Sequence, residues 1–309
     1  MTLGPDAYKA ALAGMARPSG AFAMVAIDQR ESLRAMFAEN LPDPIELDRR
    51  VAFKVAVARE LSPHASALLV DEGEGLGPIL DARALDASCA VIIAADDLVQ
   101  PLGAAVDDTH LDRGVDLANA RRRGAAAAKL LVIWKPDRSP SERASLVNEF
   151  LEVSRAAGLA GIVEGVVRPP SGVPEPEWTE REDALLEATR ELGALRPDIY
   201  KAQVPFNGKG PLEAIVERCD AMTAVIPCPW VILSSGVSIE DYPRAVEAAC
   251  RGGASGFLAG RAVWRDALTA DPVPVLRERS VPRLQRLGEI VDEFARPWTE
   301  APSPYAPTR

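Results

Sequence analysis

Short apolar runs of β-strand character alternate with segments of helical period along most of this chain, and this alternation limits the possible folds more than any other feature. Eight runs have strand character: 21–29, 66–71, 89–95, 126–134, 160–167, 198–204, 230–234 and 256–258. Strands that alternate with helices form a parallel sheet. Eight of them in 309 residues predict an α/β protein with a (β/α)8 fold, the TIM barrel, with a doubly wound open sheet as the alternative.

The segments between these runs have the residue spacing of amphipathic helices. In the segment 46–61, Leu47, Val51, Val55 and Ala58 recur every three or four residues and so share one face. No G-x-G-x-x-G motif follows the first run, which counts against an open sheet that binds a dinucleotide. We therefore favour the barrel.

The whole chain, residues 1–309, is expected to form a single barrel domain. A helix over about 6–15 would close the bottom of the barrel. Prolines exclude a helix in 168–177, so this segment is expected to be an ordered loop or a lid. The proline-rich residues 299–309 are expected to form a loose tail.

The acidic composition restricts the partners of the protein. The formal net charge is −10 and the pI is near 4.9, which disfavours nucleic acid and anionic membrane surfaces as partners. No run approaches the ~18 consecutive apolar residues of a membrane span, and the first ten residues lack a basic region followed by an apolar one. We expect a cytoplasmic protein that acts on a small molecule and forms a homo-oligomer.

Histidine and cysteine are too scarce for a metal site built on them. The chain has two histidines, and its four cysteines lack C-x-x-C spacing and are expected to be reduced. A magnesium site built from carboxylates is kept as an alternative, but the site that we predict contains neither a metal nor a cofactor.

Polar residues cluster where the predicted strands end, and in a barrel these ends meet at the functional face. The residues are Asp28, Gln29 and Arg30 after the first strand, Asp71 after the second, Glu164 in the fifth, Lys201 in the sixth, Ser234, Ser235 and Gly236 after the seventh, and Gly260 and Arg261 after the eighth. Lys129 lies in the fourth strand, nearer its start. Charged residues in four strands of one barrel each need a partner inside the same small lumen.

Lys201 is the most unusual of these residues, because it lies in the middle of a short apolar strand. A buried ammonium either pairs with a carboxylate or loses its proton and acts as a nucleophile. Lys129 is the candidate cation that would favour the neutral amine. Glu164 and Asp28 are the candidate carboxylates for proton transfer.

The ends of the last two strands suggest a phosphate site. Barrels often bind phosphate there through backbone N–H groups and a helix N-terminus. Ser234, Ser235, Gly236 and Gly260 supply such turns, and Arg261 would add a permanently charged, bidentate contact. A phosphate site, a poised lysine and a carboxylate in one barrel make a class I aldolase plausible from the residues alone.

Eight longer stretches carry a family resemblance: DQRESLRAMFA (28–38), FKVAVARELSPHASALLVD (53–71), SCAVIIAADD (88–97), KLLVIW (129–134), VVRPP (166–170), PWVILSSGV (229–237), GASGFLAGRAVW (253–264) and LQRLGEIVDE (284–293). They resemble the class I ketose-phosphate aldolases of the tagatose-1,6-bisphosphate aldolase superfamily, and most closely its sulfofructose-phosphate aldolases. The resemblance covers the chain from about residue 20 to residue 295.

The resemblance implies a function and roles for individual residues. Lys201 would form a Schiff base with C2 of the ketose, and Glu164 would shuttle protons in one charged network with Asp28 and Lys129. Ser235, Gly236, Gly260 and Arg261 would hold the C1 phosphate, while Arg30 is our candidate for the distal anion. The implied reaction of this aldehyde-lyase, a step of sulfoglycolysis, cleaves 6-deoxy-6-sulfofructose 1-phosphate to dihydroxyacetone phosphate and 3-sulfolactaldehyde.

The chain departs from the family pattern at three places. Gln203 stands where the family often has glutamate, and Gly165 follows Glu164 where proline is expected. Glu72 and Glu74 bring negative charge to a loop that could touch the far end of the substrate. Tagatose 1,6-bisphosphate and fructose 1,6-bisphosphate therefore stay open as substrates, as does a non-catalytic phosphosugar-binding barrel in which Lys201 only pairs with Glu164.

Overall fold

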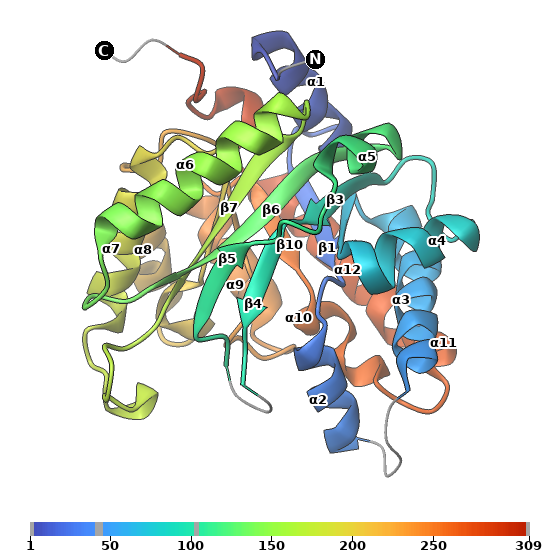
Figure 1. Cartoon of the computed structure of the whole chain (residues 1–309). Coiled ribbons are helices and arrows are strands. Elements are labelled where there is room, and N and C mark those ends of the chain that lie inside the picture. Colours follow the sequence, from blue (N-terminus) through green and yellow to red (C-terminus); the bar gives the residue numbers. More distant parts are fainter. Residues whose placement is uncertain (1–2, 41–45, 102–104, 307–309) are drawn as a thin grey trace.

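The structure, a computed structural model, describes residues 3–40, 46–101 and 105–306. Eight parallel strands close into a barrel in the order β1-β10-β9-β8-β7-β6-β3-β2 (Figure 1). The barrel strands are β1 (Phe22–Ala26), β2 (Ala67–Val70), β3 (Ala90–Ala94), β6 (Ala125–Trp134), β7 (Ala160–Val167), β8 (Ile199–Ala202), β9 (Trp230–Ile232) and β10 (Gly256–Ala259). Each overlaps one of the eight predicted runs, and the predicted TIM barrel is confirmed.

Helices connect the strands and surround the barrel (Figure 1). They are α1 (Pro5–Met15), α2 (Glu31–Asn40), α3 (Leu47–Leu61), α4 (Gly77–Asp81), α5 (Leu117–Arg122), α6 (Pro140–Ala156), α7 (Arg181–Ala194), α8 (Leu212–Thr223), α9 (Tyr242–Arg251), α10 (Arg261–Trp264), α11 (Pro272–Val275) and α12 (Val281–Phe294). None of the helices in the described part of the chain is long and apolar enough to cross a membrane.

Two elements at the carboxyl ends of the strands were not predicted. Helix α2 follows β1 directly and buries Leu33, Met36 and Phe37, which lie on one helical face. Strands β4 (Asp96–Val99) and β5 (Asp108–Leu111) form an antiparallel hairpin that the apolar pattern of the sequence did not indicate. The hairpin has few buried apolar residues, so it lacks the hydrophobic alternation by which a strand is recognised in a sequence.

The lumen of the barrel is filled by apolar side chains and closed at one end by α1. Tyr8, Leu12 and Met15 of α1 belong to the same buried cluster as the inward-facing residues of all eight strands, such as Met24 and Ile162. In Figure 1, α1 lies at the end of the barrel opposite α2 and the β4–β5 hairpin. This end is therefore a packed floor, and the opposite end is the open face.

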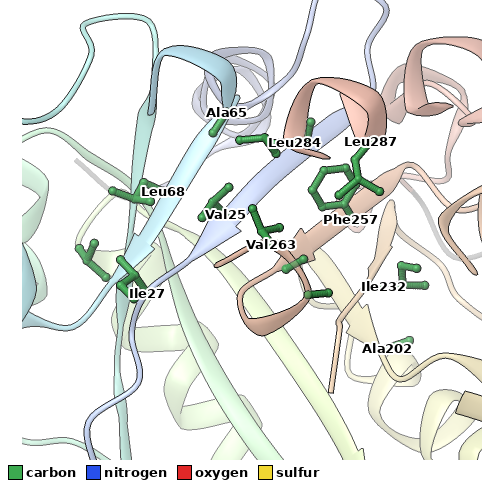
Figure 2. Close-up of a cluster of buried hydrophobic side chains, with 14 of the residues drawn as sticks. Val25, Ile27, Ala65, Leu68, Ala202, Ile232, Phe257, Val263, Leu284 and Leu287 are labelled. Carbon is green, nitrogen blue, oxygen red and sulfur yellow. The ribbon is translucent and has the colours of Figure 1, made fainter. Parts of the chain in front are cut away.

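The outward-facing strand residues form a second core beneath the helices. Figure 2 shows Val25, Leu68 and Phe257 of the sheet beside Leu284 and Leu287 of α12. All five are at most 1% exposed. Because both faces of every strand are buried, a charged side chain within the barrel must find its partners there.

The carboxyl-terminal segment packs in part against α1. The ring of Tyr305 lies 5.0 Å from that of Tyr8, and the Tyr305 hydroxyl donates a hydrogen bond to the carbonyl oxygen of Leu3 at 3.3 Å. Trp298 meets Tyr8 edge to face. Up to residue 306, the segment expected to be a loose tail is thus anchored on the floor of the barrel, and residues 307–309 lie outside the described part.

Candidate active site

The inward-facing positions of five strands change from apolar to charged at one level of the barrel. Side chains alternate along a strand, so residues two apart share a face. The lumen residues Ala26, Ala94, Ala127, Ile162 and Ile199 are each followed two positions later by a charged residue, namely Asp28, Asp96, Lys129, Glu164 and Lys201. Strand register pairs Glu164 with Lys201 and Ala94 with Lys129. The charged groups therefore form one layer on top of the apolar lumen.

Lys201 and Glu164 form a buried pair at the centre of this layer. The Nζ atom of Lys201 donates a hydrogen bond to Oε2 of Glu164 at 2.9 Å. Lys201 is 5% exposed and Glu164 is 7% exposed, so both are almost removed from water. This is the pairing that the sequence left open as either a structural ion pair or a poised nucleophile.

Lys129 is the most heavily paired cation of the layer. Its Nζ atom lies 2.6 Å from Asp96, 2.8 Å from Asp28 and 3.6 Å from Oε2 of Glu164. Burial by itself would lower the pKa of Lys129, but the three carboxylates outweigh burial and raise the pKa above its ordinary value. Lys129 is thus a fixed positive charge whose own neutralisation comes mainly from the two aspartates.

Asp96 is a member of the site that was not among the candidate residues taken from the sequence. It accepts hydrogen bonds from Lys129 and from the backbone N–H of Leu131, and Arg30 donates to it at 2.9 Å. Asp96 is 1% exposed. The signal for it was present in the sequence, since Ile92, Ala94 and Asp96 continue the inward alternation of β3.

Asp28 is held in its ionised form. Burial by itself would raise the pKa of Asp28, but Lys129, Lys201 and Arg30 outweigh burial and hold this pKa at about 2. Three carboxylates and three cations therefore share the layer, and their charges balance. An isolated charge at this depth would be unstable.

A pocket of about 330 Å³ opens beside the ends of β9 and β10, where the phosphate site was predicted. Its lining includes Ser234, Gly236, Arg261 and Arg265. The guanidinium of Arg261 donates a hydrogen bond to the hydroxyl of Ser235 at 2.7 Å. Gly236 has a φ of +83°, and a Cβ atom there would lie 2.8 Å from Oδ1 of Asn207, so a side chain is excluded on both grounds.

The pocket and the charged layer influence each other electrostatically. Burial lowers the pKa of Arg261, and the positive charges of Arg265 and Arg168 lower it further. Glu164 and Asp28 act in the opposite direction. The predicted phosphate residues and the lysine–carboxylate layer therefore lie in one electrostatic environment.

Gln29 and Gly260 meet at the boundary between the pocket and the layer. The Oε1 atom of Gln29 is buried and has no hydrogen-bond partner among the described residues. A Cβ atom on Gly260 would lie 2.8 Å from the carbonyl oxygen of Ala26 and 3.0 Å from Nε2 of Gln29. Glycine at 260 therefore lets β10 approach β1 closely.

Asp71 and Arg30, which the sequence places at the functional face, have strong protein partners. Asp71 pairs with the buried ammonium of Lys54 and accepts a hydrogen bond from the backbone N–H of Glu74, so it holds the turn Glu72–Leu76 in place. Arg30 donates two hydrogen bonds to Asp96, to the carbonyl oxygen at 2.7 Å and to the carboxylate at 2.9 Å. The acidic residue Glu74 is likewise neutralised, by Arg50.

The structure gives physical reasons for the two departures in β7 and β8. A Cβ atom on Gly165 would lie 2.3 Å from the hydroxyl of Tyr200, so this hydroxyl fills the space of a side chain. Gln203 is 4% exposed, and its Oε1 accepts a hydrogen bond from the backbone N–H of Val167 at 2.7 Å. Gln203 thus ties the ends of β7 and β8 together without adding a charge.

Comparisons with known proteins find aldolases. The model of the DeoC/LacD family of aldolases matches residues 22–266. The tagatose 1,6-diphosphate aldolase of Listeria monocytogenes strain EGD-e is 27% identical, over 92% of this chain and 91% of its own. Tagatose 1,6-diphosphate aldolase 2 of Streptococcus mutans is 23% identical, over 94% of this chain and 95% of its own.

Solved structures share the fold. A fructose-bisphosphate aldolase of Plasmodium falciparum superposes with a TM-score of 0.70 at 13% identity, covering 96% of this chain and 98% of that one. An archaeal fructose 1,6-bisphosphate aldolase superposes with a TM-score of 0.62 at 16% identity, covering 92% and 99%. At these identities the likeness is one of architecture.

Proposed function

The chain belongs to the DeoC/LacD family of aldolases, and from this premise we propose that it is a Schiff-base enzyme which cleaves a ketose 1-phosphate with a second anion at C6. The products are dihydroxyacetone phosphate and a three-carbon aldehyde that keeps this anion. The observation that carries the proposal is the hydrogen bond of 2.9 Å between Lys201 Nζ and Glu164 Oε2, in a layer whose other charges are already balanced. Within this layer, Glu164 is the carboxylate best placed to take the proton from Lys201.

The first half of the reaction forms the Schiff base. After transfer of its proton to Glu164, the Lys201 amine attacks C2 of the ketose, and the carbonyl oxygen takes up a proton to give a carbinolamine. The C2–O bond then breaks as Glu164 returns a proton to the departing hydroxyl, which leaves as water. The resulting iminium is a cation, and Asp28 and Glu164 stabilise it.

The second half breaks the carbon–carbon bond. A base removes the proton from the C4 hydroxyl, C4 becomes the aldehyde carbon, and the electron pair of the C3–C4 bond moves into the iminium to give an enamine. Protonation of the enamine at C3 and addition of water at C2 release dihydroxyacetone phosphate and restore the amine. Glu164 is the proposed base for these transfers because it is hydrogen-bonded to Lys201, whereas a pKa of about 2 makes Asp28 a weak proton acceptor.

Lys129 has an electrostatic role in the proposed reaction. Its ammonium lies 3.6 Å from the Glu164 oxygen that receives the proton of Lys201. The three carboxylates raise the pKa of Lys129, so Lys129 stays charged throughout the reaction. Lys129 is a positioning and electrostatic residue, and Lys201 is the nucleophile.

The C1 phosphate fits the pocket beside β9 and β10. Arg261 supplies charge, the Ser235 hydroxyl orients it, and Ser234 and Gly236 line the pocket, where their backbone N–H groups would bind the phosphate. The unpaired Oε1 of Gln29 would accept a hydrogen bond from a hydroxyl of the substrate. With C1 at this pocket, C2 is directed toward Lys201 on the neighbouring strand β8.

The stretches that resemble sulfofructose-phosphate aldolases favour a sulfonate at C6, which makes 6-deoxy-6-sulfofructose 1-phosphate the proposed substrate. The curated relatives are tagatose 1,6-diphosphate aldolases, so tagatose 1,6-bisphosphate is the second candidate and fructose 1,6-bisphosphate the third. The kcat/KM values for the three ketoses decide between them. We expect the highest value for the sulfonated ketose.

Borohydride trapping tests the proposed chemistry. Reduction in the presence of dihydroxyacetone phosphate should add the mass of the reduced adduct to the peptide that contains Lys201, and Lys201→Ala should not be labelled. Lys129→Arg, which keeps the neighbouring charge, is the matched control and should still be labelled at Lys201. Labelling at another lysine, or turnover by Lys201→Ala at the wild-type rate, would refute the assignment.

A further inference from the structure

We propose that Arg168 binds the anion at C6 of the substrate and thereby sets the preference for ketoses that carry one. The inference rests on the proposed function, because it takes Lys201 as the position of C2 and the pocket beside β9 and β10 as the position of the C1 phosphate. The anion is a tetrahedral oxyanion, either a sulfonate or a phosphate, and a guanidinium can bind both.

The backbone of Arg168 continues strand β7 toward the open face. Its N–H donates to the carbonyl oxygen of Trp134 at 2.9 Å, one step beyond the last residue pair of β6 and β7. Glu164 and Val166 lie on the inward side of β7, so the period of two directs Arg168 to the same side. Arg168 therefore lies above Glu164 at the mouth of the barrel.

At the open face of the barrel, Arg168 has only weak protein partners among the described residues. Its Nε atom is buried without a hydrogen-bond partner among the described residues. Arg168 forms a long ion pair with Glu175 at 3.7 Å, and the Glu175 side chain is 57% exposed. Arg30, by contrast, donates two hydrogen bonds to Asp96, which is 1% exposed. A substrate anion would satisfy Arg168 but would have to compete with a buried carboxylate for Arg30.

The order of the strands gives the direction of the substrate. The C1 phosphate lies at β9 and β10 and C2 at Lys201 on β8, so C3 to C6 extend toward the next strands, β7 and β6. Arg168 follows β7. The charge of Arg168 also lowers the pKa of Arg261, so the two guanidinium groups lie close enough to interact across the mouth. This separation of two cations around Lys201 suits a substrate with an anion at each end.

Apolar residues surround this part of the mouth. Ile133, Val166 and Leu233 form a buried cluster, and each is at most 4% exposed. They lie one inward position above Leu131, Glu164 and Val231 of the same strands. An ion pair between Arg168 and a substrate anion is therefore partly shielded from water, which strengthens it relative to an exposed pair.

The experiment compares Arg168→Gln with the wild-type enzyme on substrates that differ at C6. In the cleavage direction, kcat/KM for the ketose with a C6 anion should fall about 10- to 100-fold, the range typical of a lost charge-assisted hydrogen bond. In the synthesis direction, the effect should appear with the anionic three-carbon aldehyde and be absent with uncharged glyceraldehyde. Trapping of dihydroxyacetone phosphate at Lys201 should be unchanged, because this molecule has no C6.

Three further variants make the result specific. Glu175→Gln removes the competing carboxylate, so it should lower KM for the C6-anionic ketose, an effect that a purely structural role of Arg168 would not produce. Arg168→Lys keeps a positive charge and should recover part of the lost kcat/KM. The recovery should be larger for the ketose whose C6 anion, sulfonate or phosphate, is the one that the enzyme uses. Arg30→Gln should not change the discrimination between charged and uncharged aldehydes.

Two outcomes would overturn the inference. One is an equal loss with anionic and uncharged aldehydes in Arg168→Gln. The other is a discrimination that is lost in Arg30→Gln and kept in Arg168→Gln. Failure of the proposed function looks different, because the wild-type enzyme itself would then neither cleave the ketoses nor be trapped by dihydroxyacetone phosphate.

Discussion

Lys201 and Lys129 approach the same oxygen atom of Glu164, at 2.9 Å and 3.6 Å. The two lysines differ in their other partners, because Lys129 is also bound by Asp28 and Asp96. The amine of Lys129 is therefore in contact with three carboxylates, whereas among the described residues the amine of Lys201 has its ion pair with Glu164. This asymmetry assigns Lys129 to electrostatics and Lys201 to covalent chemistry in the proposed mechanism.

Glu164→Gln is expected to lower kcat about 10²- to 10⁴-fold, the usual contribution of a positioned acid or base, with a smaller change in KM. The amide cannot accept the proton of Lys201 or return it. Steady-state kinetics with the C6-anionic ketose measures the effect. The control is Glu191→Gln on α7, which breaks an ion pair with Arg143 on α6 outside the lumen and should leave kcat unchanged. A wild-type kcat in Glu164→Gln would contradict the assignment.

Lys129→Met is expected to lower the free energy of unfolding by about 3–5 kcal/mol, because it leaves buried carboxylates without their cation. Urea unfolding followed by circular dichroism measures the change. The matched control is Lys135→Met, whose partner Asp107 is 55% exposed at the side chain, so the loss should stay below about 1 kcal/mol. Equal losses in the two variants would mean that the charged layer is not as tightly coupled as the distances indicate.

The stability of the protein should depend on Asp28 at low pH. The folded pKa of about 2 lies below the ordinary value of 3.8, so the ionised group stabilises the fold above pH 4, and this contribution is lost as the pH falls toward 2. The shift corresponds to about 2 kcal/mol. The difference in unfolding free energy between wild type and Asp28→Asn should therefore shrink between pH 5 and pH 3. A difference that stays constant over this range would speak against the depressed pKa.

Arg261→Gln is expected to reduce kcat/KM for every ketose 1-phosphate about 10- to 100-fold, whatever group stands at C6, because it removes the charge proposed to bind the C1 phosphate. Ser235→Ala should have a smaller effect in the same direction, since it removes the hydroxyl that orients the guanidinium. Trapping of dihydroxyacetone phosphate at Lys201 should weaken in both variants. An unchanged KM for dihydroxyacetone phosphate in Arg261→Gln would place the phosphate elsewhere.

Gly165→Ala is expected to destabilise the protein by about 1–3 kcal/mol through overpacking, because its Cβ would lie 2.3 Å from the Tyr200 hydroxyl. Tyr200→Phe removes a buried hydroxyl that has no hydrogen-bond partner among the described residues, so by itself it should cost little. The double variant should be more stable than Gly165→Ala alone. Thermal unfolding of the wild type, the two single variants and the double variant gives the coupling energy between the two positions. Strictly additive changes in unfolding free energy would show that the two side chains do not touch.

Much of the site follows from local pattern. The alternation of strands and helices predicts the barrel, and the barrel brings the carboxyl ends of the strands to one face. Lys201, Glu164 and Asp28 were identified because each is a charged residue within an apolar strand or directly at its end. These are statements about one residue and its immediate neighbours in the chain, which hydrophobic periodicity can supply.

Partner choice does not follow from local pattern. Asp96 and Lys129 are 33 residues apart, and Lys54 and Asp71 are 17 residues apart, yet both pairs are in hydrogen-bond contact. The sequence could not show that Arg30 and Asp71 are bound by protein groups or that Arg168 is left loosely paired. Closure of the barrel decides which charges meet, because ion pairing depends on distances of a few ångströms between residues on different elements. By itself the sequence determined the barrel and its lysine, and only the tertiary structure decided which charges remain available to a substrate.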